Sequence, residues 1–351
     1  MEETPRSAPG PASGFVALPA ADFANLRLTY DHLRWTLIGL PILLFCVTLT
    51  IGLWKALSTG LWKDSFPSSI SAYYSGSSRD VFVGVMIAIA ACLIAYRGTT
   101  ALEEFSLNMA GFFAVFVALI PTTLESVMKQ LRTLGERPVG GFSAADYGWS
   151  LRITVFWVVI ICAVLTFLTL RRSHRTAEMF ARGGWGRRFM VAAVLLTAVF
   201  LALLVWQLYF AGSAAYVELD GLGGPAKLHN YAAIVMILLL AVAVWSHAYP
   251  DRAAKGDPTA EPYDPDLLYL YKWIFLAMTV GVVLVGVLVR LLTPDHWVLA
   301  IEWWEIGCFA FFWFVETRRA ARRRRKLGQA SAQAPAIEGA PTVQAAPMVT
   351  L

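Results

Sequence analysis

The sequence predicts an all-α, polytopic transmembrane helix bundle of about eight spans, with its N- and C-termini in the cytoplasm. The chain has 351 residues, of which 58% are hydrophobic and only 15% are charged, whereas a soluble domain of this size would expose more charge. Its apolar residues are gathered in runs of about 20, the length that a helix needs to cross a bilayer core about 30 Å thick. Because lipid offers no partner to backbone N–H and C=O groups, such runs are expected to be helical.

The apolar runs define the expected elements along the chain. We expect spans at about 34–56, 81–97, 107–127, 151–171, 188–210, 229–248, 270–292 and 297–317. Together they form a bundle over residues 31–320. Residues 1–30 are rich in Pro, Ala and Ser and lack the apolar core of a signal peptide, so we expect a disordered or amphipathic segment there. Residues 327–351 are rich in Ala, Pro and Gln and are expected to be a disordered tail.

The arginines between and after the spans predict the orientation of the bundle. Positive charge resists translocation and collects on the cytoplasmic side. Two clusters carry this signal: Arg171, Arg172, Arg175, Arg182, Arg187 and Arg188 between the fourth and fifth spans, and Arg318–Lys326 after the eighth. With eight spans, both termini are then cytoplasmic. We therefore expect a multi-pass protein of the cell membrane, either plasma or inner.

The basic run after the last span also bears on partners. The formal net charge of +5 is explained first by orientation. The Arg318–Lys326 run is expected to reach anionic lipid headgroups as well. No nucleic-acid partner is expected, because no recognition fold accompanies the run. Membrane lipid is thus the expected partner.

The cysteines and small residues inside the spans are expected to pack helices together and to have no catalytic or metal-binding role. The four cysteines, Cys46, Cys92, Cys162 and Cys308, fall in different apolar runs, so we expect neither a disulfide framework nor a zinc site. Small residues at helical spacing allow helices to approach closely. They are Gly84, Ala88 and Cys92 in the second span and Ala110, Ala114 and Ala118 in the third.

Uncommon polar residues near the outward ends of the spans predict a ligand-binding pocket that faces outward. They are Ser71, Tyr73, Arg79, Asp80, His229, Asn230, Glu302 and Glu305. Glu302 and Glu305 are three residues apart and therefore share one helix face. A charged carboxylate at that depth costs on the order of 1–3 kcal/mol unless it is partnered or protonated, so we expect a partner.

Each of these residues also has a simpler interpretation. Asp80 follows two serines and can simply complement the dipole of a helix start. His229 stands in a first helical turn, where a histidine at a membrane interface is unremarkable. On the inner side, Glu103-Glu104 and the acidic stretch from Asp251 to Asp266 are expected to be ordinary solvated loops.

The same polar residues carry a resemblance to a known group of proteins. A serine-containing outer loop, Asn108, Ala110 and Gly111 in the third span, a histidine heading a later span, and Glu302-Trp303 in the last span resemble the Frag1/DRAM/Sfk1-like group of six-span membrane proteins and related bacterial proteins. The resemblance covers about two thirds of the chain, and residues 130–215 have no counterpart in it. It implies a lipid-facing role and no defined reaction.

Three classes of function stay open at this stage. We favour a non-catalytic protein that binds lipid or regulates the organisation of membrane lipid. The first alternative is an intramembrane lipid hydrolase or transferase that uses His229 with a carboxylate. The second is a small-solute transporter, although the spans are nearly free of charge at mid-depth. No cofactor is expected, and no metal, because only His229 and His296 lie outside whereas a catalytic zinc usually has three side-chain ligands.

Overall fold

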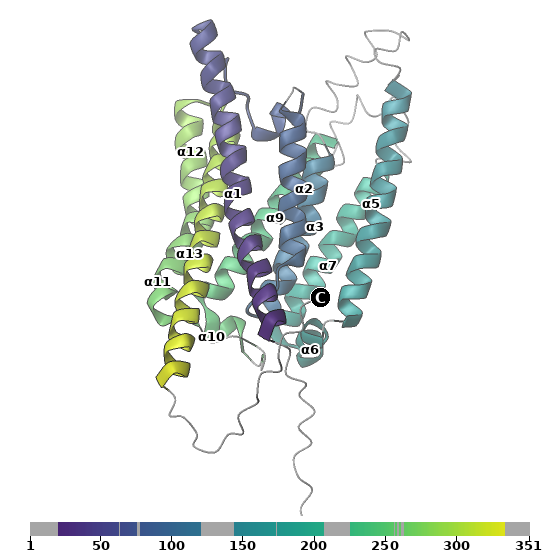
Figure 1. The fold of residues 1–351 in the computed structure, drawn as a ribbon. Coiled ribbons are helices and arrows are strands. Elements are labelled where there is room, and N and C mark those ends of the chain that lie inside the picture. Colours follow the sequence, from purple (N-terminus) through teal and green to yellow (C-terminus); the bar gives the residue numbers. More distant parts are fainter. Residues whose placement is uncertain are drawn as a thin grey trace, which may run out of the picture.

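The computed structural model describes residues 20–62, 64–75, 78–120, 144–172, 174–206, 225–255, 257, 260 and 263–333. Across these residues the chain is all-α, and its helices form one elongated bundle (Figure 1). The longer helices are α1 (Ala20–Thr59), α2 (Arg79–Ala95), α3 (Ala101–Leu119), α5 (Ala144–Arg172), α7 (Gly184–Val205), α9 (Pro225–Ala248), α12 (Val282–Leu292) and α13 (Trp297–Gln333). The shorter elements are η1 (Ile70–Ser75), α6 (His174–Arg182), α10 (Pro250–Ala253), η3 (Pro265–Leu267), α11 (Leu268–Leu276) and η4 (Ala277–Gly281).

The helices identify the chain as an integral membrane protein of the multi-pass helical class. In the described part of the chain, 6 helices are long and apolar enough to cross a bilayer. They are Arg27–Thr59, Ala101–Leu119, Gly184–Val205, Leu228–Ala248, Pro265–Leu292 and Trp297–Lys326. Helix α2 has 17 residues, and the apolar part described in α5 is Arg152–Cys162. The count of eight spans therefore stays a prediction.

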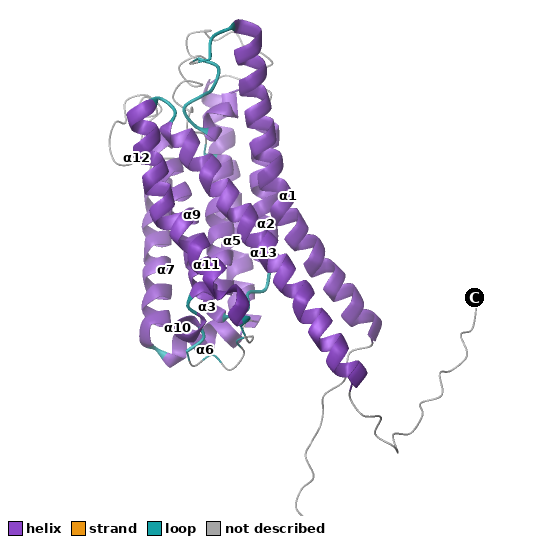
Figure 2. Cartoon of the chain, turned by 90° about the vertical axis from the view of Figure 1, so that its left-hand side faces the viewer, coloured by secondary structure: helices purple, strands orange, loops and turns teal. Residues whose placement is uncertain are grey.

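Both ends of the described chain lie at the same end of the bundle. Figure 2 shows the start of α1 and the end of α13 side by side, at the same end of the bundle as α6 and α10. An ion pair between Asp31 of α1 and Arg324 of α13 joins them there. We call this the inner end, following the orientation that the arginines predict, and the end that holds η1 the outer end.

The interior of the bundle is built around α3. Small side chains on α3 let its neighbours approach, and Ala110, Ala114 and Ala118 are fully buried. This confirms the packing role predicted for the third span. Helices α2 and α3 approach closely at Gly111, where an added Cβ would lie 2.8 Å from the carbonyl oxygen of Ala90 on α2.

We expect Gly111→Ala to force α2 and α3 apart and to lower stability by about 1–3 kcal/mol, the usual cost of overpacking. The matched control is Gly84→Ala on α2, because a Cβ at Gly84 meets no atom within 4 Å. Thermal unfolding in detergent micelles should show a lower midpoint for Gly111→Ala and an unchanged one for the control. Equal midpoints for both variants would contradict the close packing.

The start of α3 corrects one expectation. The helix begins at Ala101, before the predicted position 107, and the Thr100 side chain caps it by accepting a hydrogen bond from the Glu103 backbone N–H at 3.2 Å. Glu103 is 0% exposed, so its assignment to a solvated loop was wrong. Asp257, also assigned to such a loop, accepts a hydrogen bond from the Ala101 N–H at 3.0 Å. The inner loops are thus tied into the bundle.

Candidate functional site

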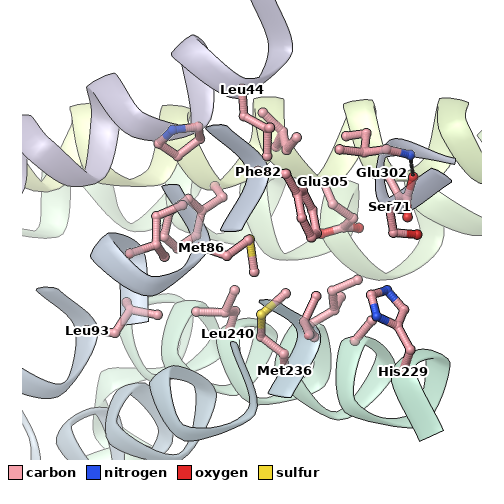
Figure 3. A pocket seen from close by; sticks show the side chains of 18 of the residues that line it. Leu44, Ser71, Phe82, Met86, Leu93, His229, Met236, Leu240, Glu302 and Glu305 are labelled. Atoms are coloured by element: carbon pink, nitrogen blue, oxygen red, sulfur yellow. Dashed lines mark hydrogen bonds between the residues drawn. The ribbon is translucent and has the colours of Figure 1, made fainter. Parts of the chain in front are cut away.

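A cavity of about 120 Å³ lies among α1, α2, α9 and α13 and extends from the outer part of α13 to Leu93, near the inner end of α2 (Figure 3). One end of the cavity is polar and the rest is apolar. The polar end is formed by Ser71, His229, Glu302 and Glu305, which come from η1, α9 and α13. Four of the eight residues predicted for an outward-facing pocket therefore line one cavity, although they are as far apart in sequence as Ser71 and Glu305.

Local structure explains how these side chains are positioned. Glu302 and Glu305 lie in the first turns of α13, three residues apart and on its inward face. The Glu302 carboxylate accepts a hydrogen bond from the Ile70 backbone N–H at 2.5 Å. This contact fixes η1 against α13 and places Ser71, the next residue, on the cavity wall.

His229 is held by the end of a neighbouring helix. Its Nδ1 lies 2.6 Å from the carbonyl oxygen of Ile120, which follows α3. A carbonyl oxygen can only accept, so Nδ1 carries the proton and donates. In the neutral imidazole the other nitrogen, Nε2, is then an acceptor. Figure 3 shows the ring facing the same space as Ser71 and Glu305.

Glu305 is the unusual member of the polar end. It is 7% exposed, and within the described residues neither carboxyl oxygen has a hydrogen-bond partner. An isolated buried carboxylate is costly, so such a group is expected to hold a proton or to meet a donor from outside the chain.

The other four predicted site residues lie elsewhere. Tyr73 is buried, but its hydroxyl donates to the carbonyl oxygen of Thr48 at 2.8 Å and ties η1 to α1; burial raises the pKa of Tyr73 to about 12. Arg79, Asp80 and Asn230 are exposed and do not line the cavity. The position of Asp80 in the first turn of α2 fits its simpler interpretation, the complement of a helix dipole.

The apolar part of the cavity runs deeper into the bundle. Its wall is made by large flexible side chains from α2, α9 and α13, including Met86, Met236, Leu240 and Phe309. One further lining residue, Met278, belongs to the π-helical turn η4. Turns of this kind interrupt regular helices and often occur at functional sites.

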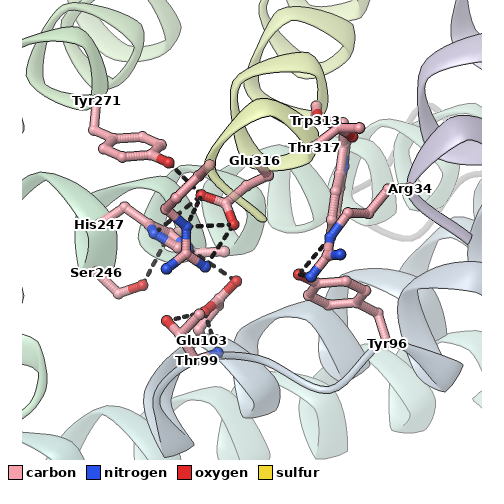
Figure 4. Close-up of polar contacts among 12 residues, drawn as sticks. Arg34, Tyr96, Thr99, Glu103, Ser246, His247, Tyr271, Trp313, Glu316 and Thr317 are labelled. Carbon is pink, nitrogen blue, oxygen red and sulfur yellow. Dashed lines mark hydrogen bonds and ion pairs between the residues drawn. The ribbon is translucent and has the colours of Figure 1, made fainter. Parts of the chain in front are cut away.

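A second cavity, of about 280 Å³, lies at the inner end of the same bundle. The sequence analysis did not predict it. Its lining includes Thr99, Thr100, Ser246, His247, Asp251, Lys255, Tyr263, Asp264, Tyr271 and Arg319. Two fully buried carboxylates, Glu103 and Glu316, contact residues of this lining (Figure 4).

These carboxylates are joined by His247 into one network. His247 Nε2 lies 3.0 Å from Glu103 and its Nδ1 lies 3.4 Å from Glu316. Arg319 Nη2 pairs with Glu316 at 2.8 Å, and the hydroxyl of Tyr271 donates to the same carboxylate. With an imidazolium at His247, the two negative charges of the network are balanced by two positive charges.

A signal for this network was present in the sequence. Glu103, His247 and Glu316 each stand at the inner end of an apolar run. Grouping span ends by membrane face, the step that found the outer cavity, would have gathered these three as well. The assignment of Glu103 to a solvated loop prevented it.

Two other kinds of site are not formed by the described residues. No group of three or more His, Cys, Asp or Glu in that part of the chain could hold a metal ion. All four cysteines are free thiols on separate helices.

Comparisons with known proteins do not place this chain in a family. A scan against protein-family models, a search of curated proteins and a search of solved structures each found no match to this chain.

Proposed function

We propose that this protein is a non-catalytic, lipid-binding protein of the cell membrane, and that its outer cavity holds part of one amphipathic lipid. The observation that carries the proposal is the division of the cavity into a polar end and an apolar end. Glu302, Glu305, His229 and Ser71 face the polar group, while Met86, Met236 and Leu240 contact the alkyl part. Small-ligand sites typically combine an apolar wall with a few polar groups that fix orientation.

The size of the cavity limits what enters it. About 120 Å³ accommodates a segment of one alkyl chain with its polar group, and the remainder of a lipid would lie between the outer halves of the helices. The resemblance of the outer loop and the last span to the Frag1/DRAM/Sfk1-like group points in the same direction. We therefore propose that membrane lipid, the expected partner, binds in this cavity.

We expect that filling the cavity removes bound lipid. In Ala233→Trp the indole would occupy the cavity, because Ala233 lines it. The matched control is Ile234→Trp on the next residue of α9, which is 54% exposed on the other face. Native mass spectrometry of gently purified protein should show less than half of the wild-type retained lipid for Ala233→Trp and an unchanged amount for the control. Equal lipid retention in the two variants would contradict the proposal.

One observation favours an intramembrane hydrolase as a second candidate. Ser71, His229 and a carboxylate line the same cavity, and a nucleophile, a base and an acid are the groups that acyl transfer needs. However, the Ser71 hydroxyl pairs with that of Ser69 at 3.0 Å, and His229 Nδ1 is oriented by a backbone carbonyl. New products from a lipid extract incubated with wild-type protein, and their loss in Ser71→Ala, would establish this candidate; no product would eliminate it.

A further inference from the structure

We infer that the outer cavity selects an amphiphile whose polar group is a primary amine, with the ammonium held between Glu305 and Glu302. This inference rests on the proposed function and names the class of ligand. It follows from the donors and acceptors at the polar end, from the unpartnered carboxyl of Glu305 and from the apolar wall beyond them.

The polar end offers hydrogen-bond acceptors and carries no fixed positive charge. Among the described residues that line the cavity there is no lysine and no arginine, but there are two glutamates. Phosphate and sulfate groups would place their negative oxygens against these carboxyls, and like charges in a low-dielectric site repel strongly. A phosphate group is therefore a poor occupant, and a cationic donor is a good one.

The number of acceptors fits a primary ammonium. One oxygen of Glu302 is used by the Ile70 N–H, which leaves the other oxygen, while both oxygens of Glu305 have no partner among the described residues. His229 Nε2 supplies a further acceptor in the neutral ring, since Nδ1 donates to Ile120. An ammonium has three N–H donors and no acceptor, so it can bond to α13 and α9 together.

The nonpolar surroundings make a quaternary ammonium a weaker ligand. Trimethylammonium groups are recognised by cages of aromatic rings, with Trp and Tyr prominent. The aromatic residues that line this cavity are Phe82, Phe309 and the ring of His229. Without N–H donors, a trimethylammonium group would also leave Glu305 without a hydrogen bond.

Four single-chain probes with the same dodecyl tail test the inference on the full-length protein in non-ionic detergent. They are dodecylamine, dodecanol, dodecyl phosphate and dodecyltrimethylammonium, and native mass spectrometry gives the apparent affinity of each. The equal tails cancel the contribution of the alkyl chain. We expect dodecylamine to bind at least about tenfold more tightly than any of the other three.

The decisive variant is Glu305→Gln, because glutamine keeps the shape of glutamate and removes the negative charge of its carboxylate. We expect it to weaken dodecylamine binding at least about tenfold and to change dodecanol binding less than about twofold. The matched control is Asp80→Asn, which removes an exposed carboxylate from the same end of the bundle without touching the cavity. It should leave both affinities unchanged. A melting temperature of Glu305→Gln at or above the wild-type value shows that this variant is folded. If Glu305→Gln does not fold, Glu302→Gln is used as the test variant in its place.

The possible outcomes separate the inference from the proposed function. If none of the four probes binds the wild-type protein, the lipid-binding proposal fails and the inference fails with it. If the alcohol, the phosphate or the trimethylammonium probe binds as tightly as the amine, or if Glu305→Gln leaves amine binding unchanged, the inference alone is overturned. If the amine is preferred and only the Glu305 variant loses that preference, both are supported.

Discussion

Replacing Arg319 with methionine is expected to lower the free energy of unfolding by about 3–5 kcal/mol, because it leaves an uncompensated buried charge. Arg319 Nε lies 3.1 Å from both carboxyl oxygens of Glu316, and Nη2 lies 2.8 Å from one of them. Glu316 is 0% exposed. Without the guanidinium, one imidazole would face two buried carboxylates.

The control for this variant is the neighbouring arginine. Arg318 is exposed, and its guanidinium lies 4.4 Å over the ring of Phe314. Arg318→Met removes the same charge and adds the same side chain, but an exposed cation of this kind contributes at most about 1 kcal/mol. Reversible unfolding in mixed micelles, followed by tryptophan fluorescence, measures both. Similar losses in the two variants would contradict the assignment of Arg319 as the main countercharge.

A double variant sharpens this result. In Arg319→Met with Glu316→Gln both charges are removed, and the remaining Glu103–His247 pair is neutral. The combined loss should be smaller than the sum of the two single losses, since neighbouring charges that share a network are not additive. Additive losses would show that the two side chains do not act as a pair.

More of the fold than of the site could be predicted from the sequence. Long apolar runs determined where the helices lie, because a run of about 20 such residues has one stable conformation in lipid. The all-α membrane bundle is confirmed. Helix ends were less predictable: α3 starts earlier than its apolar run because the Thr100 side chain caps it, and α13 continues to Gln333 as a charged helix. At the start of α3 a local polar contact therefore overrides the hydropathy signal.

The residues of the outer site that were predicted correctly include those whose side-chain direction follows from helical geometry. Glu302 and Glu305 lie on a helix three residues apart, so their shared face follows from helical geometry. Arg79 and Asp80 stand in the first turn of α2 and Asn230 stands in the second turn of α9, where one residue more or less turns a side chain outward, and all three are exposed. The inner network needed knowledge of which helices are neighbours, and a single sequence does not provide it.

The two buried carboxylates of the inner network are expected to respond very differently to the loss of their charge. Glu316→Gln should cost about 3–5 kcal/mol, because Arg319, Tyr271 and His247 all depend on this carboxylate. Glu103→Gln should cost only about 1 kcal/mol, the net value of one hydrogen bond. The difference follows from what each neighbour can do once the charge is gone.

Around Glu103 the network can adjust. Thr99 donates to one oxygen of Glu103 from its backbone N–H at 2.6 Å and from its hydroxyl at 2.7 Å, and the glutamine oxygen can accept both bonds. The amide NH₂ then faces His247 Nε2, which becomes an acceptor when the imidazole releases one proton. Glu316 and Arg319 remain paired, so the charges of the network still balance. Around Glu316 the release of the His247 proton would restore the net charge but would leave Arg319 charged and without its carboxylate partner, because a guanidinium does not release its proton.

Unfolding of the two variants in mixed micelles measures the difference in stability, and ¹⁵N NMR of the histidine side chains reports the protonation. In Glu103→Gln, Nε2 of His247 should move to the range of an unprotonated ring nitrogen. In the wild-type protein we expect both ring nitrogens to carry protons, because both lie within 3.4 Å of carboxylate oxygens. Equal losses of stability in the two variants, or a His247 that stays doubly protonated in Glu103→Gln, would refute this account of how the buried charges are balanced.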